Sequence, residues 1–238
     1  MNRKAIYAIA GVAAVAIAGV LIGLSVAGGG DKDTTPTVIV PPAGSTGAGG
    51  EAGSFLDGIA QTGAALGDPG AKVVVVEFAD IQCPYCAKFS NVTFPDVVEK
   101  YVRTGDARIE FSGVVFIGPD SERGLRAAYA AGLQNKLWNV VELLYAFQGA
   151  ENSGWVTDDL LREVGAKVPG LDVEKMLADM DSDEVDKQLG EARDAAIAAE
   201  IEGTPTFFYA PAGGTPTLLA KGAIDLASLS AALDPLLG

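Results

Sequence analysis

The chain has 238 residues, and roughly the first thirty differ in composition from the rest, which leaves about one domain of ordinary size. Seventeen Lys and Arg against 31 Asp and Glu give a formal net charge of -14, and so acidic a surface disfavours nucleic acid as a partner. The absence of histidine excludes Ser/His/Asp and Cys/His catalysis and histidine-ligated metal sites. Only two cysteines are present, which excludes a multi-disulfide scaffold and a four-cysteine zinc site.

A long apolar run opens the chain. Residues 5–27 carry no charge and are long enough to cross a hydrocarbon core of about 30 Å, and the basic residues Arg3 and Lys4 precede them. We therefore expect a cytoplasmic tail at 1–4 and a single-pass transmembrane signal-anchor at 5–27, with the remainder outside the cell membrane. The alternatives are a cleaved signal peptide, which would release a secreted protein, and a buried core helix.

The segment that follows is poor in apolar side chains that could form a core. Gly, Pro, Thr, Ser and Ala dominate residues 28–54. Such a segment cannot bury enough apolar surface to offset the entropy lost on ordering. We expect a disordered linker at 28–54 and a folded domain at 55–238.

The folded domain begins with a β-α-β pattern. Residues 72–78 form a continuous β-branched run, which predicts a buried central strand. The motif Cys83-Pro84-Tyr85-Cys86 follows, and then a helical segment to about residue 101. Pro95 lies within that segment and predicts a kink or break. A second strand is expected over 107–115.

A long helical block separates this unit from the end of the chain. Residues 121–199 have helical character, with breaks expected at 149–154 and 169–170. Two short strands and a final amphipathic helix are then expected at 206–209, 217–221 and 226–236. The order β-α-β, helical block, β-β-α indicates an α/β sandwich with a helical insertion.

The two cysteines form a CxxC pair. As a structural disulfide the pair would stabilise little, because it closes a very short loop. As a metal site it would need two more ligands, which only a second copy of the chain could supply. Redox chemistry remains, because a cysteine at the start of a helix has its thiolate stabilised by unpaired N–H groups and the helix dipole. Cys83 has that position, and Cys86, one turn further in, is the more shielded partner.

Two stretches carry a resemblance to a known family. Residues 76–86, VEFADIQCPYC, resemble the active-site strand and helix of DsbA-like thioredoxin-fold oxidoreductases, with Pro84 shaping the motif. Residues 203–208, GTPTFF, resemble the loop in which that family carries a cis-proline facing the disulfide. Leu137-Trp138 and the helices after it resemble the helical insertion of the family. The resemblance runs from about residue 66 to the end and implies a thioredoxin fold with a helical insertion at about 121–200, preceded here by a transmembrane helix.

The resemblance also assigns roles to individual residues. Glu77 matches a buried acid that assists proton transfer at the inner cysteine, and a carboxyl desolvated beside a thiol should titrate high; the alternative is an edge carboxylate that faces solvent. Pro205 matches the cis-proline, which would present the Thr204 backbone to a bound peptide; the alternative is an ordinary turn. Tyr85 occupies a position that contacts substrate and helps set the redox poise; the alternative is a solvent-facing aromatic.

One departure from the family concerns the direction of the reaction. The best-known strongly oxidising members have His where this chain has Tyr85, and Cys-Pro-Tyr-Cys also resembles the motif of glutaredoxins, which are usually reducing. The export segment, the long insertion and the chain length disfavour a glutaredoxin.

The resemblance implies an exported, membrane-tethered thiol:disulfide oxidoreductase that introduces disulfides into cysteine-containing secreted proteins through Cys83 and Cys86. Its reoxidant would be a quinone-linked membrane protein of the DsbB or vitamin-K-epoxide-reductase type, and no bound cofactor or metal is expected. The alternatives are an extracytoplasmic thiol reductase, for example in cytochrome c maturation, and a non-catalytic peptide-binding or chaperone module.

Overall fold

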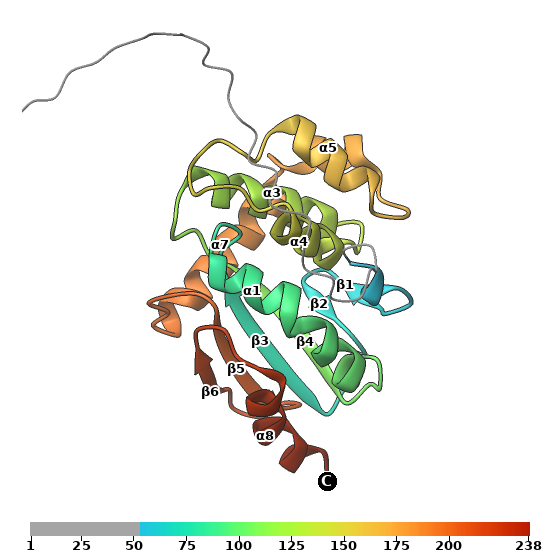
Figure 1. Ribbon diagram of the computed structural model, residues 1–238, viewed down its shortest axis with the longest axis vertical. Coiled ribbons are helices and arrows are strands. Elements are labelled where there is room, and N and C mark those ends of the chain that lie inside the picture. Colours follow the sequence, from blue (N-terminus) through green and yellow to red (C-terminus); the bar gives the residue numbers. More distant parts are fainter. Residues whose placement is uncertain (1–52) are drawn as a thin grey trace, which may run out of the picture. The chain divides into compact units, whose positions relative to one another are not determined.

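The computed structural model describes residues 53–238, in which a six-stranded sheet is packed between helices (Figure 1). The strands, in the spatial order β1-β2-β4-β3-β5-β6, are β1 (Gln61–Thr62), β2 (Ala65–Leu66), β3 (Val73–Ala79), β4 (Ala107–Gly113), β5 (Thr206–Pro211) and β6 (Thr217–Lys221). The helices are α1 (Pro84–Val92), α2 (Phe94–Val97), α3 (Pro119–Gly132), α4 (Leu137–Ala146), α5 (Asp158–Ala166), α6 (Val173–Asp179), α7 (Asp183–Ala198) and α8 (Leu226–Leu237). A 3-10 turn, η1 (Ser54–Leu56), and a π-helical turn, η2 (Val98–Val102), complete the elements.

The valine-rich strand β3 lies in the middle of the sheet, as its sequence predicts. It pairs in parallel with β4 and antiparallel with β5. Alternate residues Val73 and Val75 are buried on one face, and Phe78 is buried on the other. A strand with neighbours on both sides and cover on both faces needs apolar residues at nearly every position, which explains the unbroken valine run.

The two faces of the sheet are covered by different helices. On one face Phe89 of α1 packs against Phe207 of β5, with ring centroids 4.7 Å apart, and α8 contacts α2 and β3. On the other face Ala196 of α7 packs against Phe78 and Val114. Figure 1 shows α1 and α7 on opposite sides of the strands. The α/β architecture with helices on both faces is therefore confirmed.

The helix after the CxxC motif is interrupted where Pro95 predicts it. Helix α1 ends at Val92, and α2 begins at Phe94 with Pro95 in its first turn, where a missing N–H costs nothing. The chain then continues through α2 into the π-helical turn η2. The proline thus interrupts the helical segment, and helical structure continues beyond it to Val102.

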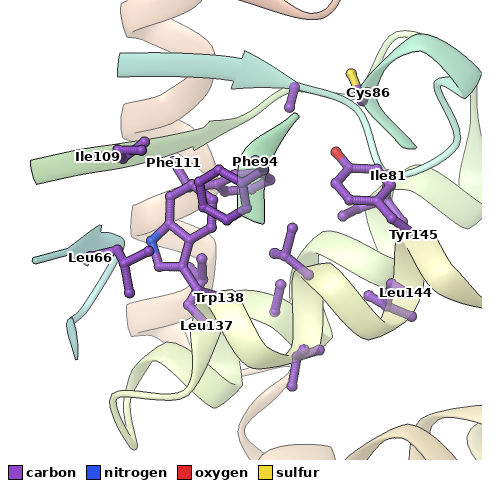
Figure 2. Close-up of a cluster of buried hydrophobic side chains, with 14 of the residues drawn as sticks. Leu66, Ile81, Cys86, Phe94, Ile109, Phe111, Leu137, Trp138, Leu144 and Tyr145 are labelled. Carbon is purple, nitrogen blue, oxygen red and sulfur yellow. The ribbon is translucent and has the colours of Figure 1, made fainter. Parts of the chain in front are cut away.

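The helical insertion is confirmed as five helices, α3 to α7, with non-helical residues at both expected breaks. Trp138 of α4 packs against the sheet side of the core: the indole stacks on Phe94 at 4.9 Å and meets Phe111 edge-on at 5.7 Å (Figure 2). The indole N–H donates to the Ala64 carbonyl oxygen at 3.0 Å. The insertion is therefore packed into the same core as the strands.

One element was not predicted. A short hairpin, β1 and β2, adds to the outer edge of β4, with Ala65 opposite Glu110. Its strands have two residues each, too few to give an alternating pattern in the sequence.

The expected cytoplasmic tail at 1–4, the transmembrane segment at 5–27 and nearly all of the expected linker at 28–54 lie outside the described residues. Among residues 53–238, no helix combines the length and the apolar character needed to cross a membrane.

Candidate active site

The two cysteines lie at the N-terminal end of α1, close to the carboxyl end of β3. The backbone of Cys83 is extended and caps the helix, and Pro84 fills its first turn. The Cys83 N–H donates to the Asp80 carbonyl oxygen at 3.0 Å, which closes the short loop from the strand. Cys83 is 5% exposed and Cys86 is fully buried, and both are unpaired thiols in this structure. Of the two residues, Cys83 is the more exposed.

The surroundings of Cys83 favour its thiolate. A hydrogen bond from the Cys86 thiol is the main cause that lowers the pKa of Cys83 from 9.0 to about 6, and burial partly opposes it. A hydrogen bond with the Thr204 side chain lowers the pKa of Cys83 further. The backbone N–H groups of Cys86 and Tyr85 act in the same direction. Cys83 is therefore largely ionised at neutral pH, which makes its sulfur a good leaving group.

Cys86 has the opposite character. Burial is the main cause that raises the pKa of Cys86 well above 9.0, and its hydrogen bond to Cys83 and the nearby Glu77 raise it further. The inner cysteine is thus a protonated thiol in the reduced protein. It must gain a proton when the disulfide opens and lose one when the disulfide closes.

Glu77 lies beneath the pair on the central strand and is 3% exposed. It stands in register between Phe111 of β4 and Phe207 of β5, so it is not an edge residue and that alternative is wrong. Burial, the nearby Glu142 and Cys83, in that order, raise the pKa of Glu77 well above 4.5. A carboxyl with a raised pKa holds its proton more tightly, and beside a thiol it is placed to give and take one.

The loop before β5 faces the outer cysteine. The peptide bond between Thr204 and Pro205 is cis, as the resemblance implies, and the alternative of an ordinary turn is wrong. Pro205 is buried. In its protonated form the Cys83 thiol donates to the Thr204 carbonyl oxygen at 3.2 Å. Residues that are 121 positions apart in the chain thus meet at the reactive sulfur.

Tyr85 lies between the cysteines in the chain but turns away from them. Its side chain is 62% exposed, and Pro84 is exposed as well. The contribution of Tyr85 to the pKa of Cys83 comes from its backbone N–H. Its ring is placed to meet a molecule that approaches from solvent.

Asp80 is a buried residue of the site that the sequence analysis missed. Its carboxylate accepts hydrogen bonds from the Gln82 N–H at 2.8 Å, the Phe116 N–H at 2.8 Å, the Ile117 N–H at 3.0 Å and the Ser121 hydroxyl at 2.5 Å. Four donors suit a buried carboxylate, which is costly to bury without them. Asp80 therefore ties the loop before Cys83 to the loop after β4.

The helical insertion also holds this loop. Tyr145 donates from its hydroxyl to the Asp80 carbonyl oxygen at 3.2 Å. The Gln148 amide donates to the carbonyl oxygens of Ile81 and Cys83 at 2.7 and 3.2 Å. Asn152 exchanges hydrogen bonds with the Gln82 side chain. These residues come from α4 and the loop after it, and nothing in the sequence marks them as neighbours of the cysteine pair.

A hollow of about 640 Å³ opens beside the site, between the end of β4 and the last turns of α7. Val115, Phe116 and Ile197 line it and are exposed. It extends to Ile201 and Glu202, which lead directly into Thr204. Within residues 53–238 no group of three or more His, Cys, Asp or Glu side chains could hold a metal ion.

A family model described as Thioredoxin matches residues 60–231, which is well over half of the chain. The chain belongs to the thioredoxin family. Within that family, it is 32% identical over 151 residues to the probable disulfide bond formation protein D of Bacillus cereus, a match that covers 62% of this chain and 70% of that protein.

Solved structures of the thioredoxin family agree in fold. Oxidised BdbD from Bacillus subtilis has a TM-score of 0.65 at 24% identity, over 75% of this chain and 97% of that chain. DsbA from Chlamydia trachomatis has a TM-score of 0.60 at 20% identity, over 73% of this chain and 90% of that chain. Together with the Bacillus cereus relative, these matches identify a DsbA-like thiol:disulfide oxidoreductase.

Proposed function

We propose that this protein is an extracytoplasmic oxidant that introduces disulfides into secreted proteins, with Cys83 as the attacked sulfur and Cys86 as its partner. The observation that carries the direction is the contrast between the two thiols: the pKa of Cys83 is lowered to about 6, whereas burial raises that of Cys86. A stabilised outer thiolate stabilises the reduced form of the pair and so makes its disulfide more oxidising. The name of the Bacillus cereus relative, a disulfide bond formation protein, supports the same direction.

The proposed reaction begins at Cys83, the more accessible sulfur. A substrate thiolate attacks the Cys83 sulfur of the disulfide, the bond to Cys86 breaks, and its electron pair goes to the Cys86 sulfur. Cys86 then takes a proton, for which Glu77 is the proposed donor. A second substrate thiol loses its proton and attacks the mixed disulfide, which releases the Cys83 thiolate. Two electrons pass from the substrate to the cysteine pair.

The proposed substrate site is the surface around Thr204 and Pro205. The Thr204 backbone would pair with an extended peptide beside Cys83, with Tyr85 at the solvent side. The hollow whose lining includes the exposed Val115, Phe116 and Ile197, beside several charged residues, would receive side chains of the substrate. Such a site is permissive in sequence, which suits an enzyme that acts on many secreted proteins.

We further propose that residues 5–27 tether the domain to the cell membrane through the linker at 28–54. The support is the length of the uncharged run and the basic residues before it. The pair has to be reoxidised by an external acceptor, because the chain holds no further cysteine. A quinone-linked membrane protein of the DsbB or vitamin-K-epoxide-reductase type is the proposed acceptor, by resemblance.

The direction is tested by the reduction potential of the Cys83–Cys86 couple in the full-length protein, equilibrated against glutathione buffers. A value near about -120 mV, as for DsbA, supports the oxidant, and a value near about -270 mV, as for thioredoxin, would make the protein a reductant.

The mechanism is tested separately with reduced peptide as the substrate. Cys83→Ser should abolish oxidation of the peptide, whereas Cys86→Ser should accumulate a mixed disulfide between Cys83 and a peptide offered in oxidised form. Oxidation that persists in Cys83→Ser would contradict the assignment of the attacked sulfur.

A further inference from the structure

A second buried carboxyl lies close to Glu77 and belongs to the helical insertion. Glu142 is 4% exposed and sits in α4, whose residues are otherwise almost all apolar. The Ser90 hydroxyl of α1 donates to the Glu142 carboxyl at 2.8 Å, across 52 positions of sequence. A buried ionisable group with a single donor is costly to a fold unless it is neutral or has a task.

The geometry of two packed helices places Glu142 next to the inner cysteine. Cys86 and Ser90 are one helical turn apart and therefore share a face of α1. Glu142 and Tyr145 are three positions apart and share a face of α4. The bond between Ser90 and Glu142 shows that these two faces meet. In Figure 2 the Tyr145 hydroxyl points toward the part of the chain that carries Cys86.

The ionisable groups that face this region come from α1, β3, α4 and the loop after β3, and they carry no positive charge. They are Cys83 and Cys86 at the start of α1, Glu77 on β3, Asp80 in the loop, and Glu142 and Tyr145 on α4. Among residues 53–238, no Lys or Arg forms an ion pair with Glu77 or Glu142. Glu142 and Cys83 are the groups that act on Glu77 by their charge, so a charge on one carboxyl opposes a charge on the other.

The resulting pKa shifts agree with this arrangement. Burial raises the pKa of Glu142 to about 8, and the hydrogen bond from Ser90 opposes the shift. Glu142 is in turn the second cause, after burial, of the raised pKa of Glu77. Two like groups that repel each other in a dry site lose their protons in two coupled steps that belong to the pair.

We propose that Glu142, held by Ser90, is a positioning residue that acts through Glu77, so that the two carboxyls together store the proton that Cys86 gains and loses. This inference rests on the proposed role of Glu77. When the Cys83–Cys86 bond breaks, the electron pair goes to the Cys86 sulfur and one proton of the carboxyl pair neutralises it. One carboxylate remains, and a proton from solvent, equivalent to the one released by the second substrate thiol, restores the pair.

The proposal gives Ser90 a defined effect. Its hydroxyl stabilises the ionised form of Glu142, and that charge makes it harder for Glu77 to ionise. Removal of the hydroxyl or of the Glu142 charge should therefore lower the pH at which Glu77 ionises. Threonine at position 90 keeps the hydroxyl and should keep the native behaviour.

The test follows the step in which Cys86 must lose its proton. Reduced full-length protein is mixed with oxidised glutathione, and the closing of the mixed disulfide on Cys83 by Cys86 is followed by acid quench and mass spectrometry across pH. Glu142→Gln and Ser90→Ala should each move the midpoint of the rate profile down by about one pH unit. Ser90→Thr and the exposed Glu163→Gln should leave the midpoint in place.

The outcomes separate this inference from the proposed role of Glu77. Glu77→Gln should slow the closing step and leave only the pH dependence of the Cys86 thiol itself, and a rate profile that Glu77→Gln does not change overturns the role of Glu77. If Glu77→Gln changes the rate profile while Glu142→Gln and Ser90→Ala leave its midpoint unchanged, the role of Glu142 is wrong and that of Glu77 stands. Because Ser90→Ala is small and leaves the carboxyl in place, it decides the question even if Glu142→Gln folds poorly.

Discussion

The cysteine pair stands between two regions that treat buried carboxyls in opposite ways. On what we name the loop side, Asp80 accepts four hydrogen bonds, from two loops and a helix. On the helix side, which comprises Glu77, Glu142 and Ser90 between β3, α1 and α4, the Ser90 hydroxyl donates a single hydrogen bond, to Glu142. Burial is similar on both sides, so the number of donors makes the difference. A carboxylate surrounded by donors fixes the backbone, and a carboxyl without them is free to exchange a proton.

The largest expected effect concerns the pH dependence of stability. Glu142 titrates at about 8 in the folded protein against an ordinary 4.5, so the folded state holds its proton more tightly than the unfolded state does. The free energy of unfolding that Glu142 contributes is therefore complete below pH 4.5 and is lost as the pH rises toward 8, by up to about 5 kcal/mol. The free energy of unfolding of Glu142→Gln, relative to that of the native protein, should therefore be higher at pH 8 than at pH 5 by several kcal/mol.

Urea unfolding at pH 5 and pH 8 measures this difference. The exposed Glu163→Gln, which removes a carboxyl on α5, serves as the control and should show the same offset at both pH values. If Glu142→Gln changes the free energy of unfolding equally at the two pH values, the pKa of Glu142 is not raised, and the contrast between the helix side and the loop side is wrong.

On the loop side the expected effect is a loss of stability that does not need a change of pH. Asp80→Asn puts an amide N–H₂ among four donors, so at least one of them loses its acceptor. We expect the free energy of unfolding to fall by about 3 kcal/mol at pH 7, measured by urea unfolding. Asp96→Asn on the exposed side of α2 should change it by no more than about 0.5 kcal/mol. If Asp80→Asn leaves the free energy of unfolding unchanged, the four hydrogen bonds to Asp80 contribute little to stability.

A third prediction concerns the link between the sulfurs. The Cys86 thiol is the largest cause of the lowered pKa of Cys83, so Cys86→Ala should raise that pKa from about 6 toward 9. Titration of thiolate absorbance in the ultraviolet measures the shift. Tyr85→Phe should leave the pKa of Cys83 where it is, because only the backbone of Tyr85 acts on the sulfur. If the pKa of Cys83 is unchanged in Cys86→Ala, the low pKa comes from the helix terminus alone.

The smallest effect is expected for Tyr145, whose hydroxyl reaches from the helix side to the loop side. Tyr145→Phe removes one hydrogen bond to the Asp80 carbonyl oxygen and should lower the free energy of unfolding by about 1 kcal/mol. It should leave the midpoint of the mixed-disulfide profile unchanged. A shifted midpoint would mean that Tyr145 itself takes part in proton exchange.

The features that the sequence predicted correctly are those that depend on residues close together in the chain. The unbroken valine run predicts β3, Pro95 predicts the division after α1, and the CxxC motif predicts which helix begins with a reactive cysteine. These features depend on residues within one turn or one strand of each other, where periodicity and local conformation decide. The acid Glu77 and the Thr204–Pro205 loop were found because their motifs are close in form to those of a known family.

The remaining residues of the site could not be found in this way, because their roles arise from contacts between distant segments. Glu142 meets Ser90 across 52 positions, and Asp80 takes donors from residues 36 to 41 positions away. A weak signal did exist: a lone glutamate within the apolar stretch of residues 137–146 is an expensive choice for a helix that is buried. The sequence alone does not say which partner makes that choice tolerable.

The hydrogen bonds from α4 and the loop after it to residues 80–83 have a consequence for how the domain unfolds locally. Gln148 and Asn152 satisfy backbone and side-chain groups of a loop that belongs to the sheet half of the fold. The reactive turn and the inserted helices therefore form one cooperative unit, whose amide protons should exchange with solvent together. The insertion is then no removable addition to a smaller redox domain, since excising it would leave the turn before Cys83 without the groups that hold it in shape.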